Sequence, residues 1–192
     1  MLVNTLFENK VERLYDVSVR LASVLEGAGI PYQIIGGFAV FLHVDSVDPL
    51  GARLTRDVDI TVDRARLQEI VAAVEPAGFR YRHVAGVDML VDAKEPRARS
   101  AVHLVFANEK VRPEYIDVAP GISRPERSTR EYWIAPVADL VRMKLTSFRL
   151  RDKVHIQDLD SARLITQEIE EGLSEALRGR LAEVRKLAAD ER

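Results

Sequence analysis

Two aspartates at alternate positions of an apolar segment are the residues of this 192-residue sequence best suited to chemistry. Asp57 and Asp59 open the run Asp-Val-Asp-Ile-Thr-Val, which predicts a half-buried strand over residues 58–62. Alternate side chains of a strand share a face, so the two carboxylates converge, about 6 to 7 Å apart at the backbone. Cations such as Mg²⁺ bind carboxylates and assist nucleotidyl transfer. Seen alone, Asp-x-Asp is more often a turn or a solvated strand edge.

A pair of glycines upstream adds a second feature. Gly36 and Gly37 lie between a predicted strand over 32–35 and a predicted helix over 38–43. The N–H groups at a helix N-terminus can hold a phosphate, and glycine lets the phosphate come close to the backbone. In isolation the pair indicates only a tight turn, but its combination with the aspartates favours a phosphate and metal site.

A lysine on the apolar face of a later helix is the third candidate. The residues after Pro136 have helical spacing, and Lys144 falls in the middle of their apolar face. Burying an unpaired ammonium is costly, so Lys144 should reach a carboxylate or a ligand phosphate, or else extend to the rim of the helix. If the helix continues, Arg151 lies near the same face, whereas Arg142 and Arg149 point to solvent.

The elements that must position these residues alternate between helix and strand. Helical spacing extends over 11–24 and stops at Gly29, and a second helix over 67–74 is closed by Gly78. Strands are predicted over 79–84, 87–91, 101–106 and 133–134, with a charged stretch over 94–100 and a surface connection over 108–130. We expect an α+β fold: a mixed β-sheet core flanked by helices over 1–135 and a helical C-terminal part over 136–192 that packs against the cleft.

Together these motifs resemble those of a known superfamily. GGFAV at a helix start, followed by RLTRDVDITV entering a strand, resembles the nucleotidyltransferases that include DNA polymerase beta, and more narrowly their small bacterial members of the AbiEii toxin type. PVADLVRMKLTSFRLRDKVHIQDLD resembles the narrower family's helical motif, in which a lysine and an Arg-Asp pair precede an Asp-Leu.

The resemblance implies an NTP donor and roles for particular residues. Asp57 and Asp59 would hold Mg²⁺ or Mn²⁺ at the catalytic centre. Nucleotide-binding roles fall on Gly36, Gly37, Arg53, Thr55 and Lys144. The acceptor would be a hydroxyl on a protein, an RNA or a small molecule.

The superfamily also implies a third carboxylate on a later strand, where this sequence has His103. Alternation buries Val102, Leu104 and Phe106 and leaves His103 on the side of the aspartates. Imidazole binds Mg²⁺ poorly and Mn²⁺ or Zn²⁺ better. Four interpretations of His103 follow. It is a general base with a pKa near ~6.5, or it is a ligand of a softer metal. Otherwise the site binds nucleotide without turnover, or His103 is a hydrogen-bonded histidine with no ligand role.

Other ionisable residues are weaker candidates. Asp88 is the fallback for the missing acid if its strand lies beside that of Asp59, and Asp92 and Glu109 rank below it. His155 and Asp158 lie three apart on a predicted helix, where pairing on the helix surface is favoured over a metal site.

Composition limits the class of protein. A net charge of −2 excludes general attraction to nucleic acid or anionic lipid, and the absence of cysteine excludes disulfides and thiolate chemistry. The start of the sequence lacks the pattern of a signal peptide, and no apolar run approaches the ~20 residues of a membrane span. We therefore expect a cytoplasmic protein without a membrane partner.

Three functions compete at this point. The first is metal-dependent nucleotidyl transfer from an NTP to a hydroxyl. The alternative is a catalytically impaired nucleotide-binding protein, or an interaction protein with a protein partner in a toxin–antitoxin pair. A metal-dependent phosphohydrolase ranks last because the sequence lacks a histidine-rich ligand set.

Overall fold

The computed structural model describes residues 2–55, 57–93, 101–122, 125–128 and 131–190, with the side chains of residue 12 and of residues 14 onward in these ranges. The charged stretch predicted over 94–100 lies outside the described residues. Within the described ranges, no helix has both the length and the apolar character that crossing a membrane requires.

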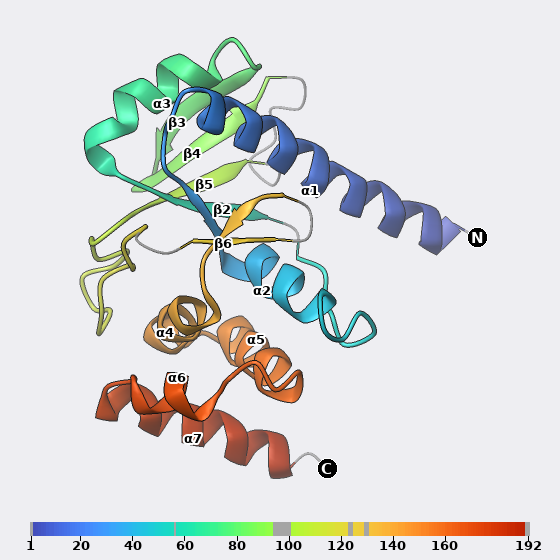
Figure 1. Ribbon diagram of the computed structural model, residues 1–192, viewed down its shortest axis with the longest axis vertical. Coiled ribbons are helices and arrows are strands. Elements are labelled where there is room, and N and C mark those ends of the chain that lie inside the picture. The colour runs from blue at the N-terminus through green and yellow to red at the C-terminus, as the bar shows by residue number, and fades with distance from the viewer. Residues whose placement is uncertain (1, 56, 94–100, 123–124, 129–130, 191–192) are drawn as a thin grey trace.

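A mixed sheet of seven strands, counted over the described residues, forms the centre of the molecule (Figure 1). Along the chain the strands are β1 (Gln33–Ile35), β2 (Val58–Val62), β3 (Phe79–Val84), β4 (Val87–Asp92), β5 (Val102–Phe106), β6 (Glu126–Arg127) and β7 (Trp133–Ile134). Their spatial order is β3-β4-β5-β2-β1-β7-β6. The central strand β2 runs antiparallel to β1 and parallel to β5, which places the segment that carries Asp59 between two neighbours.

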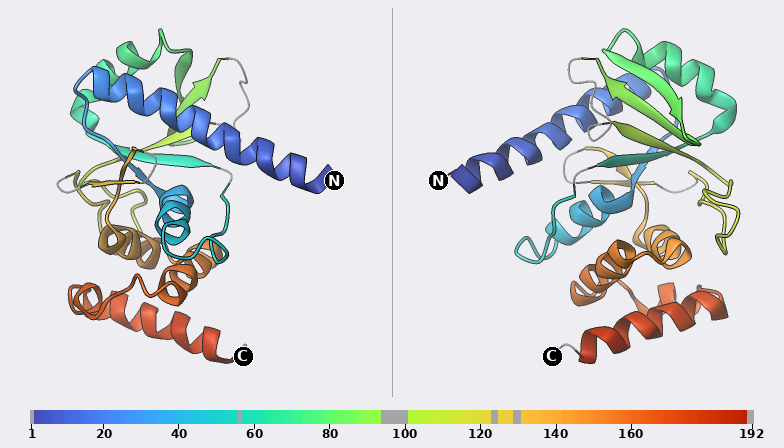
Figure 2. Two further views of the ribbon diagram at one scale, coloured as in Figure 1. Left: turned by 45° about the vertical axis from the view of Figure 1, so that its right-hand side comes forward. Right: turned by 180° about the vertical axis from the view of Figure 1, so that it is seen from behind.

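The helices cover both faces of the sheet. They are α1 (Leu2–Gly27), α2 (Gly36–Asp45), α3 (Leu67–Val74), α4 (Val137–Ser147), α5 (Leu150–Ser161), α6 (Gln167–Glu171) and α7 (Glu175–Asp190), with a 3₁₀ turn at Arg64–Arg66 before α3. Helices α1 and α3 lie on one side of the sheet, α2, α4 and α5 lie on the other, and α6 and α7 are outermost (Figures 1 and 2). The N-terminal end of α1 extends beyond the sheet in all three views.

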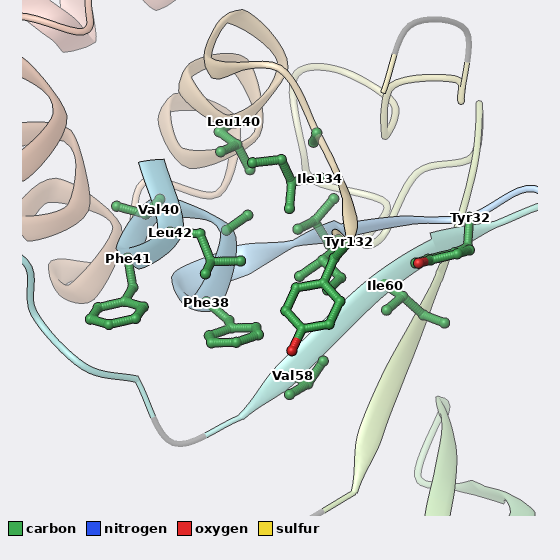
Figure 3. Packing of buried hydrophobic residues seen from close by; sticks show 14 of the residues in the cluster. Tyr32, Phe38, Val40, Phe41, Leu42, Val58, Ile60, Tyr132, Ile134 and Leu140 are labelled. Carbon is green, nitrogen blue, oxygen red and sulfur yellow. The ribbon is translucent and has the colours of Figure 1, made fainter. Parts of the chain in front are cut away.

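Helix α2 is apolar on all sides because it is enclosed between the sheet and the C-terminal helices. Every residue from 36 to 44 is buried. The ring of Phe38 stacks on Phe41, with centroids 6.2 Å apart, and lies 6.5 Å from the ring of Tyr132. In Figure 3 the ring of Tyr132 lies between Phe38 and Ile60, with Val58 of β2 below it. This packing fixes α2, and with it the glycines at its start, against the strand that carries Asp59.

The predicted α+β class and mixed sheet are confirmed. The strands predicted over 58–62, 79–84 and 133–134 have those bounds, and the other predicted strands differ by one residue at one end. The segment over 108–130, predicted as a surface connection, also contains β6.

The predicted position of Arg149 on the outer face of a helix was wrong. The C-terminal helix does not continue past Phe148, which has a left-handed φ of 50° and separates α4 from α5. Arg149 is therefore the residue before α5 rather than part of an outward helix face. Its backbone N–H donates to the Asp152 carboxylate at 3.2 Å, which caps the new helix.

The two predicted parts of the chain share their packing. One hydrophobic cluster joins Ile34 and Phe38 of the sheet part with Leu140, Ile156 and Leu177 of the helical part. The boundary between residues 135 and 136 stays a prediction.

Candidate active site

Gly36 brings the backbone of α2 against the carboxylate of Asp59. It follows β1, whose last residue, Ile35, is opposite Asp59 in the antiparallel ladder. Its φ is +73°, and a Cβ atom there would lie 2.1 Å from Asp59 Oδ2. No side chain at Ile35 caps α2. The first N–H groups of α2 thus lack a side-chain cap and lie next to a carboxylate, an arrangement suited to a phosphate with its cation.

His103 lies beside Asp59, on the same face, as the alternation predicted. The two residues are opposite one another in the parallel β2–β5 ladder, and His103 Nδ1 is 3.0 Å from Asp59 Oδ1. An ionised carboxylate only accepts, so Nδ1 is the donor and Nε2 of the neutral ring remains an acceptor. The hydrogen bond to Asp59 raises the pKa of His103 against the opposing effect of burial, and the charges of Asp59 and Asp57 add to this increase.

Asp57 precedes β2 and is as exposed as Asp59, at 30% of the side chain. Its Oδ2 lies 3.8 Å from a guanidinium nitrogen of Arg151, which comes from the first turn of α5. An Arg-to-Asp distance of this length is at the outer limit of an ion pair, and the Arg151 side chain is 71% exposed. Asp57 therefore keeps a partly exposed carboxylate without a close ion pair.

The other predicted nucleotide-binding residues support the glycine turn. A Cβ atom on Gly37 would lie 2.8 Å from Thr55 Oγ1 and 3.1 Å from His155 Cε1. Arg53 pairs with Asp158, its Nε 2.9 Å from Oδ1. These residues hold the loop before β2 against α2 and α5.

A cavity of about 590 Å³ extends from this site, a volume in the range of small-molecule sites. Gly36, Asp59 and His103 line one end. The α4–α5 junction lines one wall with Lys144, Thr146, Ser147 and Arg149, while β5, the β3–β4 turn and the segment over 109–119 complete the lining. Asp57, Gly37, Arg53 and Thr55 are not among its lining residues.

Lys144 has the anionic partner that its burial required. Its Nζ donates to Asp152 Oδ1 at 3.1 Å, and Asp152 is fully buried. The same carboxylate accepts from Ser147 Oγ at 2.7 Å and from Arg149 Nε at 2.8 Å. Burial raises the pKa of Asp152, but the hydrogen bond from Arg149 and the charge of Lys144 outweigh it and lower the pKa to about 2. Two cations share one carboxylate, so this wall keeps one surplus positive charge.

Sequence reasoning assigned no role at this wall to Ser147, Arg149 or Asp152, although Asp152 belongs to the Arg-Asp pair of the resemblance. The signal was present in the spacing of Arg149 and Asp152, since an acidic residue three positions after a helix start is typical of a capping interaction. The helical spacing of α4 was extended to Arg149, which placed that residue on an outer helix face instead of at a helix start.

The predicted surface pairing of His155 and Asp158 was wrong. Both side chains are buried, His155 packs on Gly37, and Asp158 binds Arg53. Burial, followed by the charge of Lys144, lowers the pKa of His155 to about 4. The imidazole is therefore neutral in the folded protein at physiological pH.

The fallback carboxylates do not replace a third acid. Strand β5 separates β4 from β2, and Asp88 is opposite Leu104, so Met89 takes the position beside His103. Asp92 is buried in an ion pair with Arg20, and Glu109 pairs with Arg64.

The carboxylates of this site could hold a divalent cation only together with oxygen ligands from a substrate. Within the described ranges, no group of three or more His, Asp or Glu side chains could hold a metal ion by itself. Mg²⁺ is commonly held by one or two carboxylates together with substrate phosphates and water. Asp59, which lies against Gly36 at the start of α2, and Asp57, two residues before it, fit that mode.

Two solved structures are similar to this one over most of the chain. An antigenic nucleotidyltransferase-like protein from Paracoccidioides brasiliensis is 17% identical, with a TM-score of 0.58 over 93% of this chain and 90% of that chain. The antibiotic-resistance factor ANT(2'')-Ia is 16% identical, with a TM-score of 0.50 over 95% of both chains. No model of a protein family and no curated protein matches the sequence.

At this identity the likeness establishes the fold. The chain has the nucleotidyltransferase fold, which confirms the predicted superfamily resemblance at that level. The narrower resemblance to AbiEii-type proteins stays a prediction.

Proposed function

We propose that the protein transfers a nucleotidyl group from an NTP to a hydroxyl acceptor, with Mg²⁺ or Mn²⁺. The observation that carries the proposal is the position of Asp59, whose carboxylate lies between Gly36 and His103 at the end of a cavity. A glycine helix start, a carboxylate and a proton acceptor meet there, next to a wall with surplus positive charge.

The two oxygens of Asp59 have different neighbours. Oδ1 accepts the hydrogen bond from His103, and Oδ2 lies beside Gly36. In the proposed site Asp59 would use Oδ2, together with Asp57, to hold the cation. When bound, the cation neutralises phosphate charge and favours ionisation of the attacking hydroxyl.

The transfer itself is a displacement at the α-phosphorus. The acceptor oxygen forms a new O–P bond, the bond from the α-phosphorus to the bridging oxygen breaks, and pyrophosphate leaves with the electron pair. The hydroxyl proton goes to Nε2 of His103, which Asp59 orients through Nδ1. The start of α2 and the Lys144–Arg149 wall would hold the phosphates.

Transfer of label tests this function. Purified protein is incubated with each α-labelled NTP, Mg²⁺ or Mn²⁺, and a cell extract as the source of acceptor. We expect label in a product and release of pyrophosphate, both reduced by at least about 100-fold in Asp57→Ala/Asp59→Ala. Asp63→Ala, at the other end of β2, is the control that should keep activity. Transfer that persists in the double variant rejects the assignment.

A second candidate function is nucleotide binding without turnover. One observation favours it. His103, which is hydrogen-bonded to Asp59, occupies the position where the superfamily implies a third carboxylate. Such a protein would bind an NTP and release no pyrophosphate with either metal, while His103→Asp would gain release. Steady release by the unchanged protein removes this candidate.

A further inference from the structure

Of the described residues that line the cavity, two carry a phenyl or phenol ring, Phe106 and Tyr115. Phe106 is 6% exposed, and the guanidinium carbon of Arg64 lies over its ring, 3.5 Å from the centroid. Its position in β5 alternates with that of His103, so the two side chains lie on opposite faces of the sheet. The ring of Phe106 is therefore already covered, and Tyr115 is the ring that a ligand could reach.

Tyr115 is half-buried although it belongs to a surface segment. Its neighbours Glu114 and Ile116 are exposed, and its backbone N–H donates to the carbonyl oxygen of Arg112 at 3.1 Å, which closes a turn. Within the part of the chain that the structure describes, its ring contacts no other ring or cation and its hydroxyl has no hydrogen bond. An aromatic side chain that lines a cavity without a partner of its own indicates a surface that a ligand covers.

The cavity places Tyr115 close to the α4–α5 junction. The segment over 109–119 lies next to α4 (Figures 1 and 2), and an ion pair of 3.7 Å joins the two. The pKa of Arg149 is raised chiefly by its hydrogen bond with Asp152, against the effect of burial, and electrostatic interactions with Tyr115 and Asp59 add to this increase. Arg149 is therefore within electrostatic reach of both the Tyr115 hydroxyl and the Asp59 carboxylate.

This arrangement matches the parts of a nucleoside triphosphate. Its phosphates need the cation at Asp59, the start of α2 and the Lys144–Arg149 wall, so its base is left for the remainder of the cavity. A cavity of about 590 Å³ has room for a whole nucleotide. Every base has a π-face, and stacking on an aromatic side chain holds a base without contacts to its hydrogen-bonding edge.

We propose that Tyr115 stacks on the base of the bound nucleotide, and that the site therefore prefers purine to pyrimidine nucleoside triphosphates. The inference rests on the proposed function for the position of the phosphates. Stacking increases with the ring area that overlaps, and a purine has two fused rings where a pyrimidine has one. The contact thus distinguishes bases by ring size.

Binding of nucleotides that cannot react tests the proposal. The α,β-methylene analogues of ATP and CTP, and inorganic triphosphate, are titrated into the full chain with Mg²⁺ in a calorimeter. We expect the ATP analogue to bind at least about threefold more tightly than the CTP analogue. Tyr115→Ala should weaken binding of the ATP analogue about 5- to 150-fold and remove the preference, whereas Tyr115→Phe should keep both.

Inorganic triphosphate separates stacking from a structural role of Tyr115. It has no base, so Tyr115→Ala should leave its affinity unchanged. Ile116→Ala is the matched control, because Ile116 is 40% exposed and is not among the lining residues, and it should leave all three affinities unchanged. The proposal is overturned by equal binding of the two analogues, by a preference that persists in Tyr115→Ala or is lost in Tyr115→Phe, by equal weakening of triphosphate and the ATP analogue, or by no binding of the ATP analogue.

A parallel measurement of pyrophosphate release from ATP and CTP, with cell extract as the source of acceptor, distinguishes this proposal from the proposed function. Release in the same ATP-to-CTP ratio by the unchanged protein and by Tyr115→Ala supports nucleotidyl transfer and overturns stacking on Tyr115. A preference for the ATP analogue that depends on Tyr115, without any release, supports stacking and counts against transfer.

Discussion

At the scale of single residues, position 36 imposes two constraints that only glycine satisfies. Its φ of +73° is strained for L side chains, and the place of its Cβ is taken by the carboxylate of Asp59. The first constraint concerns backbone stability, and the second concerns the site. Gly29 has a positive φ but no neighbour at its Cβ position, so a comparison of Gly29 with Gly36 separates the effect on stability from the effect on the site.

Gly36→Ala should damage the site more than the fold. Backbone strain costs about 1 to 2 kcal/mol of stability, and the displaced Asp59 carboxylate should lower nucleotide binding and transfer by at least about tenfold. Gly29→Ala is the matched control, because Gly29 has a φ of +64° and nothing within 4 Å of its Cβ position. Urea unfolding and nucleotide titration of both variants measure the two effects. Equal loss of nucleotide affinity in both variants would contradict the close approach of Gly36 to Asp59.

His155 should make stability depend on pH in the acidic range. Its pKa is about 4 in the folded protein and near 6.5 when exposed, because burial and Lys144 oppose protonation, as Arg151 does, while Asp152 and Asp59 favour it. The unfolded chain binds the proton more readily, so this contribution is complete above pH 6.5 and is lost as pH falls toward 4. Unfolding free energy should drop by about 2 to 3 kcal/mol between about pH 7 and 4.5 from this group. His155→Asn should show a shallower slope in urea titrations, and an unchanged slope would refute the assignment.

At the scale of elements, the junction of α4 and α5 brings a helix end and a helix start to the cavity wall. The left-handed Phe148 ends α4 in place of a continuous helix, and Asp152 then gathers Lys144, Ser147 and Arg149 around one buried carboxylate. The turn is thus held by charge and hydrogen bonds as well as by apolar packing.

Asp152→Asn should weaken this junction strongly. Removal of one partner leaves Lys144 buried without compensation, which costs about 3 to 5 kcal/mol. Asp160→Asn on the same helix is the control, because Asp160 pairs with Arg185 at the partly exposed surface and should cost at most about 1 kcal/mol. Chemical denaturation of the two variants gives the comparison. A loss below about 1 kcal/mol for Asp152→Asn would show that the junction does not depend on the carboxylate.

At the scale of the whole molecule, the sheet and the C-terminal helices depend on one another. Leu140, Leu145 and Ile156 are fully buried, and α4 and α5 pack on α2. Each such side chain contributes about 2 kcal/mol through burial. The cavity needs both parts as well, since the sheet supplies Asp59 and His103 and α4 supplies Lys144.

A chain limited to residues 1–135 should therefore not fold by itself. Without α4 and α5 the apolar face of α2 is exposed, which removes the packing that orders the Gly36 turn. Circular dichroism with thermal unfolding should show no cooperative transition for 1–135 and a cooperative one for the full chain. A cooperative transition of the shorter chain would mark residues 1–135 as an independent domain.

Much of the fold could be predicted because local periodicity reflects burial. The strand over 58–62 and the Gly-Gly helix start are visible in the residues, since alternation and glycine have direct conformational causes. The break at Phe148 could not be predicted, because a left-handed phenylalanine is held by surrounding structure and leaves no local pattern.

The sequence by itself determined which reactive groups are present. They are a carboxylate pair, a glycine turn, a lysine on an apolar helix face that needs an anion, and a histidine on the strand where an acid was expected. Only the tertiary structure decided which groups meet. His103 contacts Asp59 Oδ1 and Lys144 donates to Asp152, whereas Asp88 lies opposite Leu104 and not beside the site. The reason is that strand order and helix junctions are set by long-range packing, whereas residue type and spacing report only local geometry.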